Sequence, residues 1–336
     1  MKTRWRTLAC AVQALSLFVP GFLGSASADP IRPATLTIYH EQPRLALAPG
    51  ARSKLDAGQG ARVLKEAGWT GGDFFKDAAR LERWMEFSFD GSEDHIDRRE
   101  FELTGEGTAR GLLRSRKLRS CLDWALLKAA LIRSAGYPAL IVEAVDVRWM
   151  KEVRNGRAAK GLFGHVLVEV YVGGRWALLD STSSKYIPDY DPANPIIPES
   201  DGDGYLCAAA KGRDPVDYGL GTVWKRMSYL RRFAKSVDPD RFRAPGYKFV
   251  DLPGSGESLP NLSEAALARP DPSHPGFFGA TVQIRARDLD IHVEKSGGRY
   301  LALLYPYGRV FQGRPAKTLS FGSRAALKRY LWSLLP

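Results

Sequence analysis

The alternation of apolar and polar residues is clearest in the centre of the chain. Residues 120–136 read S-C-L-D-W-A-L-L-K-A-A-L-I-R-S-A-G, which predicts a helix with a glycine stop. An apolar run over 139–147 predicts a strand. Two further apolar runs, 164–172 and 175–180, flank Gly173-Gly174, a pattern typical of a hairpin with a two-residue turn. A helix packed on an antiparallel sheet, and therefore an α+β fold, is predicted for this region.

Weaker patterns surround this centre. Residues 35–40 predict one strand, and residues 60–89 have the apolar spacing of helices. Residues 109–118 read as a short basic helix or turn, and residues 223–234 as a helix. The stretch 187–205 is rich in Pro, Asp and Gly, which predicts an irregular loop.

The last third of the chain changes in character. Proline and glycine are dense over 239–275, which predicts a linker or an extended wrap. Beyond it, 281–294 and 300–305 flank Ser296-Gly-Gly298 as a second hairpin, and 323–335 is amphipathic. We therefore predict a small α+β appendage over residues 276–336.

The N-terminus has the layout of a cleavable secretory signal. Three basic residues precede an apolar run over 8–23, and small residues lead up to Ala28. The expected domains are a signal peptide over 1–28 and a catalytic domain with a helical lead-in over 29–238. No other stretch approaches the roughly 18 apolar residues of a membrane span. We expect a protein that is exported, to the periplasm or beyond, after cleavage near Ala28.

The chain is basic, with a formal net charge of +12. Removing the signal takes away Lys2, Arg4 and Arg6 and no acid, which leaves +9. Such a surface attracts polyanions. The clusters at 114–119 and 225–232 carry no interleaved aromatic motif for nucleic acid, so we interpret them as solvated basic faces. The expected partner is a protein or peptide substrate, such as a cell-envelope component, and no nucleic acid.

Two cysteines, Cys121 and Cys207, remain beyond the signal. In an oxidising compartment they form either one disulfide or two separate thiols, and the sequence leaves both open. Ser120 and Asp123 have the spacing of a capping box, which makes Cys121 the first helical residue. The unpaired N–H groups and positive dipole there favour a thiolate and can hold an oxyanion. The alternative for this clue alone is an inert core thiol.

The predicted hairpin supplies a histidine and an acid. With a two-residue turn at Gly173-Gly174, Leu167 faces Asp180 across the strands, and His165 is a diagonal neighbour of Asp180 on the same face. A carboxylate beside one imidazole nitrogen fixes the tautomer and leaves the other nitrogen to take a thiol proton. The alternative is a strand-end histidine and a solvated turn aspartate.

These residues resemble the transglutaminase-like superfamily, whose arrangement is of the papain type. S-C-L-D-W-A-L-L-K-A-A-L-I-R-S-A-G-Y-P-A is similar to its cysteine helix, and G-H-V-L-V-E-V-Y-V-G-G-R-W-A-L-L-D-S-T to its histidine and aspartate hairpin. The resemblance implies that Cys121 is the nucleophile, His165 the general base and acid, and Asp180 the group that orients the histidine. It is strong over about 115–185 and weaker from residue 66 to 221.

Two features of the sequence depart from the pattern of the family. Ser120 stands where many members have glycine, and no glutamine lies between Gln59 and Gln283 to complete an oxyanion hole. The side-chain donor is therefore unidentified. The remaining histidines lack metal spacing, and the acidic loop over 189–203 lacks the register of an EF-hand, so we predict no metal and no cofactor.

The function predicted is that of an exported cysteine enzyme that forms an acyl-enzyme from an amide or peptide carbonyl. Water as acceptor makes it a peptidase or amidase, and an amine makes it a transglutaminase-type acyltransferase. We favour hydrolysis because no pocket for a specific acceptor is visible in the sequence. The alternative from another class is a binding module that keeps the transglutaminase-like fold without the chemistry.

Overall fold

The structure is a computed structural model of the 336-residue chain. The segment 1–28, for which a signal peptide is predicted, lies outside the residues that the structure describes. These residues are 31–91, 107–157, 163–254, 262, 267–271, 273–284 and 288–334. No helix in these ranges is both long and apolar enough to cross a membrane.

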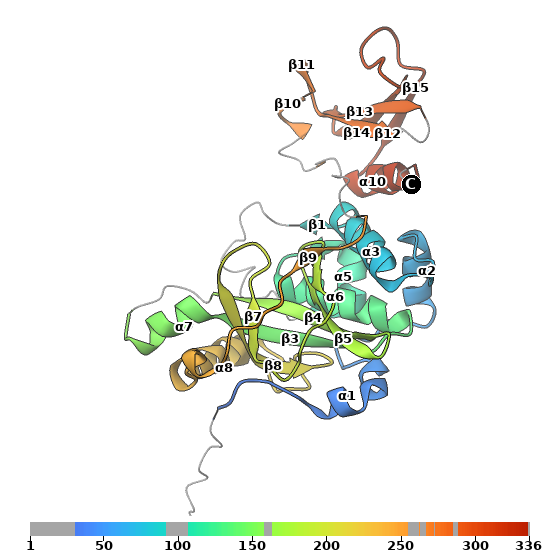
Figure 1. The fold of residues 1–336 in the computed structure, drawn as a ribbon. Coiled ribbons are helices and arrows are strands. Elements are labelled where there is room, and N and C mark those ends of the chain that lie inside the picture. The colour runs from blue at the N-terminus through green and yellow to red at the C-terminus, as the bar shows by residue number, and fades with distance from the viewer. Residues whose placement is uncertain are drawn as a thin grey trace, which may run out of the picture. The chain divides into compact units, whose positions relative to one another are not determined.

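A seven-stranded sheet forms the centre of the fold (Figure 1). Every pairing in it is antiparallel, and the strand order is β7-β8-β3-β4-β5-β6-β9. Its central strands are buried along most of their length, as expected of a sheet that is covered on both faces. The strands are β3 (Ala139–Asp146), β4 (Gly164–Val172), β5 (Arg175–Asp180), β6 (Lys185–Ile187), β7 (Ile196–Pro198), β8 (Tyr205–Gly212) and β9 (Val250–Asp251).

Helix α6 (Cys121–Ser134) is the predicted apolar helix, and it packs on β3 and β4. It is apolar around most of its circumference because further helices surround it. These are α2 (Gln59–Glu66), α3 (Phe74–Ser88) and α5 (Ala109–Ser115). Helices α2 and α5 contact α6 directly. One hydrophobic cluster joins all four helices to the sheet, so the start of α6 is fixed relative to the strands.

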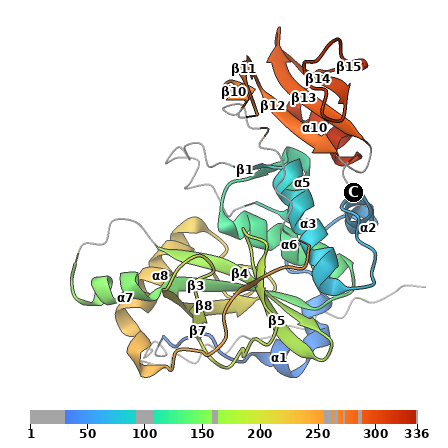
Figure 2. The ribbon, with the colours of Figure 1, turned by 45° about the horizontal axis from the view of Figure 1, so that its top comes forward.

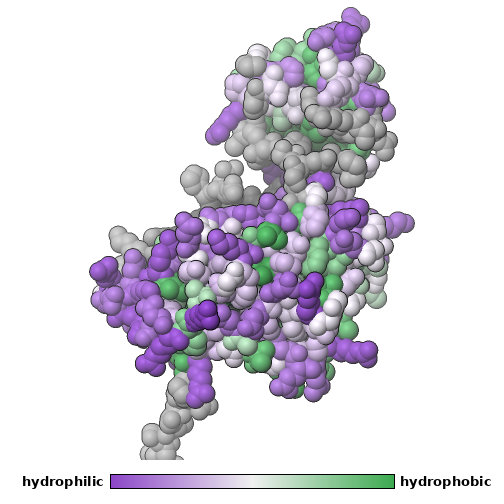
Figure 3. Space-filling view, viewed as in Figure 1, coloured by the Kyte–Doolittle hydropathy of each residue, from purple (hydrophilic) through white to green (hydrophobic). Residues whose placement is uncertain are grey.

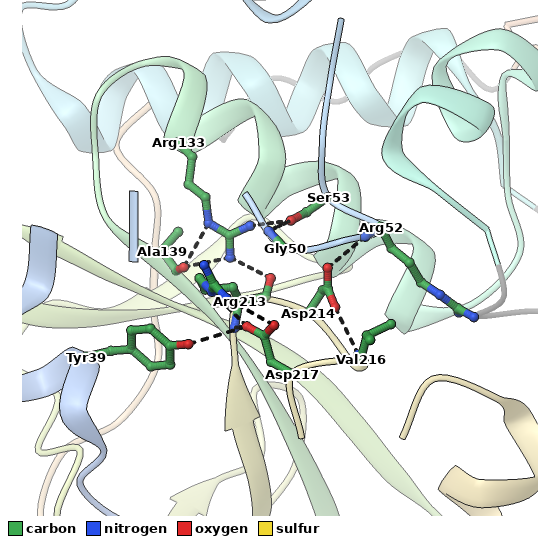
Figure 4. A network of polar contacts seen from close by, with 10 residues as sticks. All are labelled: Tyr39, Gly50, Arg52, Ser53, Arg133, Ala139, Arg213, Asp214, Val216 and Asp217. Atoms are coloured by element: carbon green, nitrogen blue, oxygen red, sulfur yellow. Dashed lines mark hydrogen bonds and ion pairs between the residues drawn. The ribbon is translucent and has the colours of Figure 1, made fainter. Parts of the chain in front are cut away.

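The last turn of α6 is held by a buried arginine (Figure 4). Arg133 donates from Nη1 to Ser53 Oγ at 2.7 Å, and from Nε to the Ala139 carbonyl at 3.0 Å. Its Nη2 donates to the carbonyls of Ala139 and Arg213 at 2.7 and 2.6 Å. One side chain thus ties the helix to the N-terminal segment, to β3 and to the residues after β8.

Helices α7 (Val147–Arg154) and α8 (Val223–Ser236) pack together beside β3 and β8. The even-numbered residues of β3 point to the opposite face of the sheet, where they form an apolar cluster with Ala46 from the segment η1 (Pro43–Leu47). The sheet therefore has an apolar cluster on each face, which is the physical basis of its nearly continuous burial.

The C-terminal region contains a second antiparallel sheet with one helix packed on it (Figure 2). Ser296 faces Arg299 in the register of β13 and β14, so the predicted Gly297-Gly298 turn is confirmed. The single predicted stretch 281–294 is in fact two strands. The elements are β12 (Ala280–Ile284), β13 (Leu289–Ser296), β14 (Arg299–Pro306), β15 (Lys317–Phe321) and α10 (Arg324–Trp332).

The prediction of a strand over 35–40 is wrong. The chain forms a short helix, α1 (Ile38–Glu41), because His40 turns inward. Its Nδ1 accepts from the Thr37 N–H at 2.9 Å, and its Nε2 lies 2.8 Å from Glu169 Oε2 in the interior. The β-branched residues that suggested a strand are overruled by this tertiary contact.

Two further elements were not predicted from the sequence. The strand β3 ends at Asp146, whose carboxylate accepts from the Trp149 N–H at 2.7 Å and so begins helix α7. Within the predicted loop 187–205, Ile196–Pro198 forms β7, since the buried pair Ile196 and Ile197 aligns with Cys207 and Leu206.

The predicted domain boundaries stay a prediction. Within the predicted linker 239–275, Val250–Asp251 pairs with β6 at the edge of the seven-stranded sheet. The first part of that stretch therefore follows the central sheet, and the regular elements of the second sheet begin only at Ala280.

Candidate active site

Cys121 is the first residue of α6, as the capping pattern predicts. Ser120 Oγ accepts from the Asp123 N–H at 3.3 Å. The Asp123 carboxylate reaches back to the Arg119 N–H at 3.0 Å, one residue before the position that a capping box predicts. The amides of Cys121 and Leu122 precede the first intrahelical hydrogen bond and are available to an external acceptor. Cys121 as a residue is of intermediate exposure at this helix end.

The hairpin of β4 and β5 has the predicted register. Leu167 faces Asp180, and Val172 faces Arg175 across a turn in which Gly173 and Gly174 both have positive φ. This turn matches the right-handed twist of the strands. His165 Nε2 lies 3.1 Å from Asp180 Oδ1, so the predicted neighbours are in contact.

The position of His165 depends on the glycine before it. A Cβ atom on Gly164 would lie 2.4 Å from the Ala144 carbonyl oxygen, so a side chain there would push β4 away from β3. Of the pair, the imidazole is 24% exposed and the Asp180 side chain 2%. The histidine is therefore accessible from solvent, and its aspartate is buried behind it.

Asp180 is held as an anion by several donors. Its Oδ1 accepts from the N–H groups of Thr182 and Ser183 at 2.7 and 3.1 Å, and its Oδ2 accepts from Ser200 Oγ at 2.6 Å. Burial alone would raise the pKa of Asp180, but His165, Ser200 and the Thr182 amide outweigh it and hold the pKa well below its usual range. The carboxylate is thus ionised and has one fixed orientation.

The backbone of Asp180 is held from α6. Lys128 Nζ donates to the Asp180 carbonyl at 2.7 Å, and the same ammonium is paired with Glu82 of α3. Burial raises the pKa of Glu82 to about 8, although Lys128 acts in the opposite direction. This chain of contacts fixes the end of β5 relative to the helix that carries Cys121.

A second buried ion pair lies beside the thiol. Arg226 of α8 donates from Nε to Glu143 Oε2 at 2.8 Å, and the Tyr218 hydroxyl lies 3.4 Å from Glu143 Oε1. The Glu143 side chain is fully buried, and that of Arg226 is 16% exposed. The guanidinium contributes positive charge near Cys121.

The two cysteines have opposite electrostatic surroundings. Burial raises the pKa of the Cys121 thiol, but hydrogen bonding to His165 and the charges of His165 and Arg226 outweigh it, and the pKa is lowered overall. Burial would lower the pKa of His165, whereas Asp180 and Cys121 raise it to about 10. The lowered thiol pKa and the raised imidazole pKa together favour a thiolate beside an imidazolium.

Cys207 has no such partner. It is fully buried in β8, and burial raises the pKa of its thiol to about 12. Cys121 and Cys207 are both free, so of the two arrangements that the sequence leaves open, the structure has separate thiols.

Four supporting residues are absent from the sequence prediction: Ser200, Lys128, Arg226 and Glu143. One signal was present, because Glu143 interrupts an otherwise apolar strand, and a buried acid requires a cationic partner. The interpretation of 225–232 as a solvated face is wrong at Arg226. Nothing in the local pattern distinguishes Ser200 or Lys128.

The remaining candidates lie elsewhere. His40 contacts Glu169, and His274 and His292 lie near Asp271, while His95 is outside the described residues. In the acidic loop, Asp201 is paired with Lys185 and Glu199 with Arg148. The described ranges contain no group of three or more side chains placed to hold a metal ion.

Comparisons with known proteins agree with the predicted fold class. Residues 70–181 match the model of the transglutaminase-like superfamily. No curated protein matches the chain. A solved structure, that of a candidate cysteine protease from Cytophaga hutchinsonii, is 19% identical with a TM-score of 0.35, and the match covers 56% of this chain and 53% of that one. The chain thus spans about half the length of that structure, and the likeness is too low to support a conclusion.

Proposed function

Residues 70–181 belong to the transglutaminase-like superfamily, and on this premise we propose that the chain is a cysteine enzyme that forms an acyl-enzyme on Cys121. The observation that carries the proposal is the position of the His165 imidazole. Its Nε2 is 3.1 Å from a buried carboxylate, and the imidazole also interacts with the Cys121 thiol, whose pKa is lowered. Nucleophile, base and orienting acid are thereby arranged in the order that thiol acyl transfer requires.

The proposed reaction begins with proton transfer from the Cys121 thiol to His165. The thiolate attacks the carbonyl carbon of an amide, and the oxyanion lies at the start of α6, where two N–H groups are available. The tetrahedral intermediate collapses as His165 donates its proton to the leaving amine, and the C–N bond breaks to leave a thioester. Asp180 stabilises the imidazolium in each of these steps.

The thioester is then resolved by a second nucleophile. His165 takes a proton from the incoming water or amine, which attacks the thioester carbonyl, and the thiol leaves and recovers a proton. We favour water, and therefore a peptidase or amidase, over an amine. The chemistry at Cys121 is the same in both cases, so the acceptor depends on how far the site excludes water.

The setting of the reaction is part of the proposal. The basic N-terminus, apolar run and small residues before Ala28 support export after signal cleavage. The residues around the site support a catalytic domain over 29–238, with 239–275 as a linker and 276–336 as an appendage. The substrate class is a protein or peptide, with cell-envelope proteins and wall peptides as the first candidates.

Selective alkylation tests the proposal. In mildly acidic buffer, iodoacetamide should label Cys121 much faster than Cys207, because the pKa of the Cys121 thiol is lowered and that of the buried Cys207 thiol is raised, so a larger share of Cys121 is thiolate. The variant His165→Ala should slow labelling of Cys121, and Cys207 in the same molecule is the control. Equal and slow labelling of both thiols would contradict the proposal and leave the non-catalytic binding module.

Envelope extracts incubated with the wild type or with Cys121→Ala identify the acceptor. New peptide termini that form only with the wild type indicate hydrolysis. Incorporation of a labelled primary amine into extract proteins indicates transfer. Both products are read by mass spectrometry, and the absence of both in the wild type contradicts an acyl-enzyme function on these substrates.

A further inference from the structure

Helix α8 is strongly basic. It carries five basic residues and no acid in the sequence V-W-K-R-M-S-Y-L-R-R-F-A-K-S. Arg226 is turned inward to Glu143, whereas Lys225, Arg231, Arg232 and Lys235 are exposed. In the part of the chain that the structure describes, none of these four forms an ion pair with a carboxylate. The space-filling view shows a mostly hydrophilic surface over α7 and α8 (Figure 3).

A cavity of about 570 Å³ lies along one side of this helix. Its lining combines two cations with three aromatic rings and contains no carboxylate. The lining residues are Tyr218, Gly219, Leu220, Trp224, Lys225, Ser228, Tyr229 and Arg232. Trp224 is 81% exposed, which is unusual for so large an apolar side chain. The nearby carboxylate of Asp217 is already paired with Arg213 at 2.8 Å.

Helical spacing sorts the exposed cations into two groups. Lys225 and Arg232 are seven residues apart and lie on one face of α8, the face that lines the cavity. Arg231 and Lys235 are four residues apart on a different face, and neither lines the cavity. Helix α8 thus has two exposed cations that line the cavity and two that do not, and the second two serve as a control for the first.

The cavity is joined to the candidate active site through Glu143. The ring of Tyr218 lines the cavity, and its hydroxyl lies 3.4 Å from Glu143 Oε1. The other oxygen of Glu143 accepts from Arg226 Nε, and Arg226 lies near enough to Cys121 for its charge to act on the thiol. Tyr218, Glu143 and Arg226 thus link the cavity lining to the electrostatic surroundings of Cys121.

We propose that this cavity binds an acidic segment of the polypeptide substrate, with Lys225 and Arg232 facing its carboxylates and Trp224 packing on its backbone and side-chain stems. The proposal rests on the proposed function, since the segment is the part of the acyl donor next to the attacked amide. Charge complementarity selects this occupant, because the lining offers two cations and no carboxylate to pair with a basic peptide. The net charge of the chain acts in the same direction at longer range.

Binding is tested first, with turnover removed. The full chain carrying Cys121→Ser is titrated with a fluorescein-labelled peptide that alternates glutamate and alanine around a central glutamine, and anisotropy is recorded. Replacing each glutamate of the peptide by glutamine gives the neutral control peptide. We expect the acidic peptide to bind about fivefold or more tightly than the neutral one, and the difference to shrink as salt is added.

Two double variants locate the binding. Lys225→Gln with Arg232→Gln should lower the affinity for the acidic peptide about fivefold. Arg231→Gln with Lys235→Gln removes the same charge from the same helix and should change it less than about twofold. The proposal is overturned if the two double variants lower the affinity equally, or if the neutral peptide binds as tightly as the acidic one. It is also overturned if a single-stranded oligonucleotide binds as tightly as the acidic peptide and the Lys225→Gln, Arg232→Gln variant abolishes that binding.

Measurements of turnover distinguish the proposed binding surface from the proposed acyl-enzyme reaction. With the wild type, the ratio of kcat/KM for acidic and neutral peptides should fall in the cavity variant and stay constant in the control variant. If no peptide is turned over but binding follows the cavity cations, the proposed reaction fails and the binding surface stands. If peptides are turned over without charge preference, the reaction stands and the binding surface fails.

Discussion

Among the residues that the structure describes, two histidine–aspartate pairs have similar geometry, and only one of them lies beside a cysteine. His165 Nε2 is 3.1 Å from Asp180 Oδ1, and His292 Nδ1 is 3.2 Å from Asp271 Oδ2. Both histidines stand on the first strand of a hairpin with a Gly-Gly turn. Distance and local fold alone therefore do not distinguish a reactive histidine from a structural one.

The difference lies in the second ring nitrogen. His292 is fully buried, its Nε2 is 3.0 Å from the Phe278 carbonyl, and the Phe311 ring packs against it. Both nitrogens are thus engaged, and residues 276–336 contain no cysteine. His165 interacts with the Cys121 thiol as well as with its aspartate, and its side chain is partly exposed. An imidazole with a carboxylate on one side becomes useful only when the other side remains open to exchange a proton.

Replacing each histidine by alanine gives the largest expected contrast. His165→Ala should lower turnover by about 10²–10⁴-fold, the range for loss of a general acid and base. His292→Ala should leave turnover within about twofold but lower the free energy of unfolding by about 1–3 kcal/mol, since a buried aspartate loses a partner. Steady-state kinetics and chemical denaturation measure the two effects. If the His292 variant also loses turnover while folded, the contrast drawn between the pairs is wrong.

Neutralising the two aspartates should give a smaller contrast. Asp180→Asn removes the charge that stabilises the His165 imidazolium, and turnover should fall about 10²-fold. Asp271→Asn should not affect turnover. Because Asp180 raises the pKa of His165, the asparagine variant should lose the His165 proton at lower pH. The change in the alkylation rate of Cys121 that accompanies this loss should therefore move to lower pH. If that change stays at the wild-type pH, Asp180 does not act through His165.

The cation beside the first pair can be removed separately. Arg226→Met leaves Glu143 buried without its partner, and the free energy of unfolding should fall by about 3 kcal/mol. In folded protein, the pKa of Cys121 should rise, so alkylation in mildly acidic buffer should slow. Replacing Glu143 and Arg226 together by Gln and Met should recover part of the stability and part of the alkylation rate, because the Glu143 carboxylate raises the pKa of Cys121. A folded Arg226→Met variant that is alkylated as fast as the wild type would mean that the guanidinium charge does not act on the thiol.

The pH dependence of alkylation gives the smallest but most specific effect. The thiolate is the reactive form, so the rate should rise with pH through a midpoint below 9.0, the ordinary thiol pKa, because the pKa of Cys121 is lowered. The ion pair is lost as pH rises through about 10, where His165 loses its proton. Stopped-flow labelling measures the profile. An acid limb at or above the ordinary thiol value would contradict the thiolate–imidazolium pair.

The sequence predicted those parts of the site that depend on local structure. Ser120 specifies the start of α6 through its own hydroxyl, and the Gly-Gly turn specifies which strand residues face each other. Both are determined within a few residues, so spacing is sufficient to predict them. The assignment of catalytic roles to Cys121, His165 and Asp180 remains a proposal, which the variants above test.

The parts that were not predicted depend on contacts between distant segments. Arg226 reaches Glu143 across 83 residues, and Lys128 reaches the Asp180 carbonyl across 52. The periodicity of apolar residues along the sequence does not predict contacts between such distant residues. The failed strand at 35–40 has the same cause, because the helix there is stabilised by the buried contact of His40 with Glu169.

The buried guanidinium of Arg133 has a consequence for motion. It anchors the last turn of α6 to three segments, while the apolar cluster encloses the middle of the helix. Amide protons beyond the first turn of α6 should therefore exchange with solvent only when the whole core unfolds. The helix that carries Cys121 at its first position is therefore expected to stay fixed when a ligand binds. Deuterium uptake of α6 beyond its first turn should be the same in free and ligand-bound protein, and a change there would contradict this expectation.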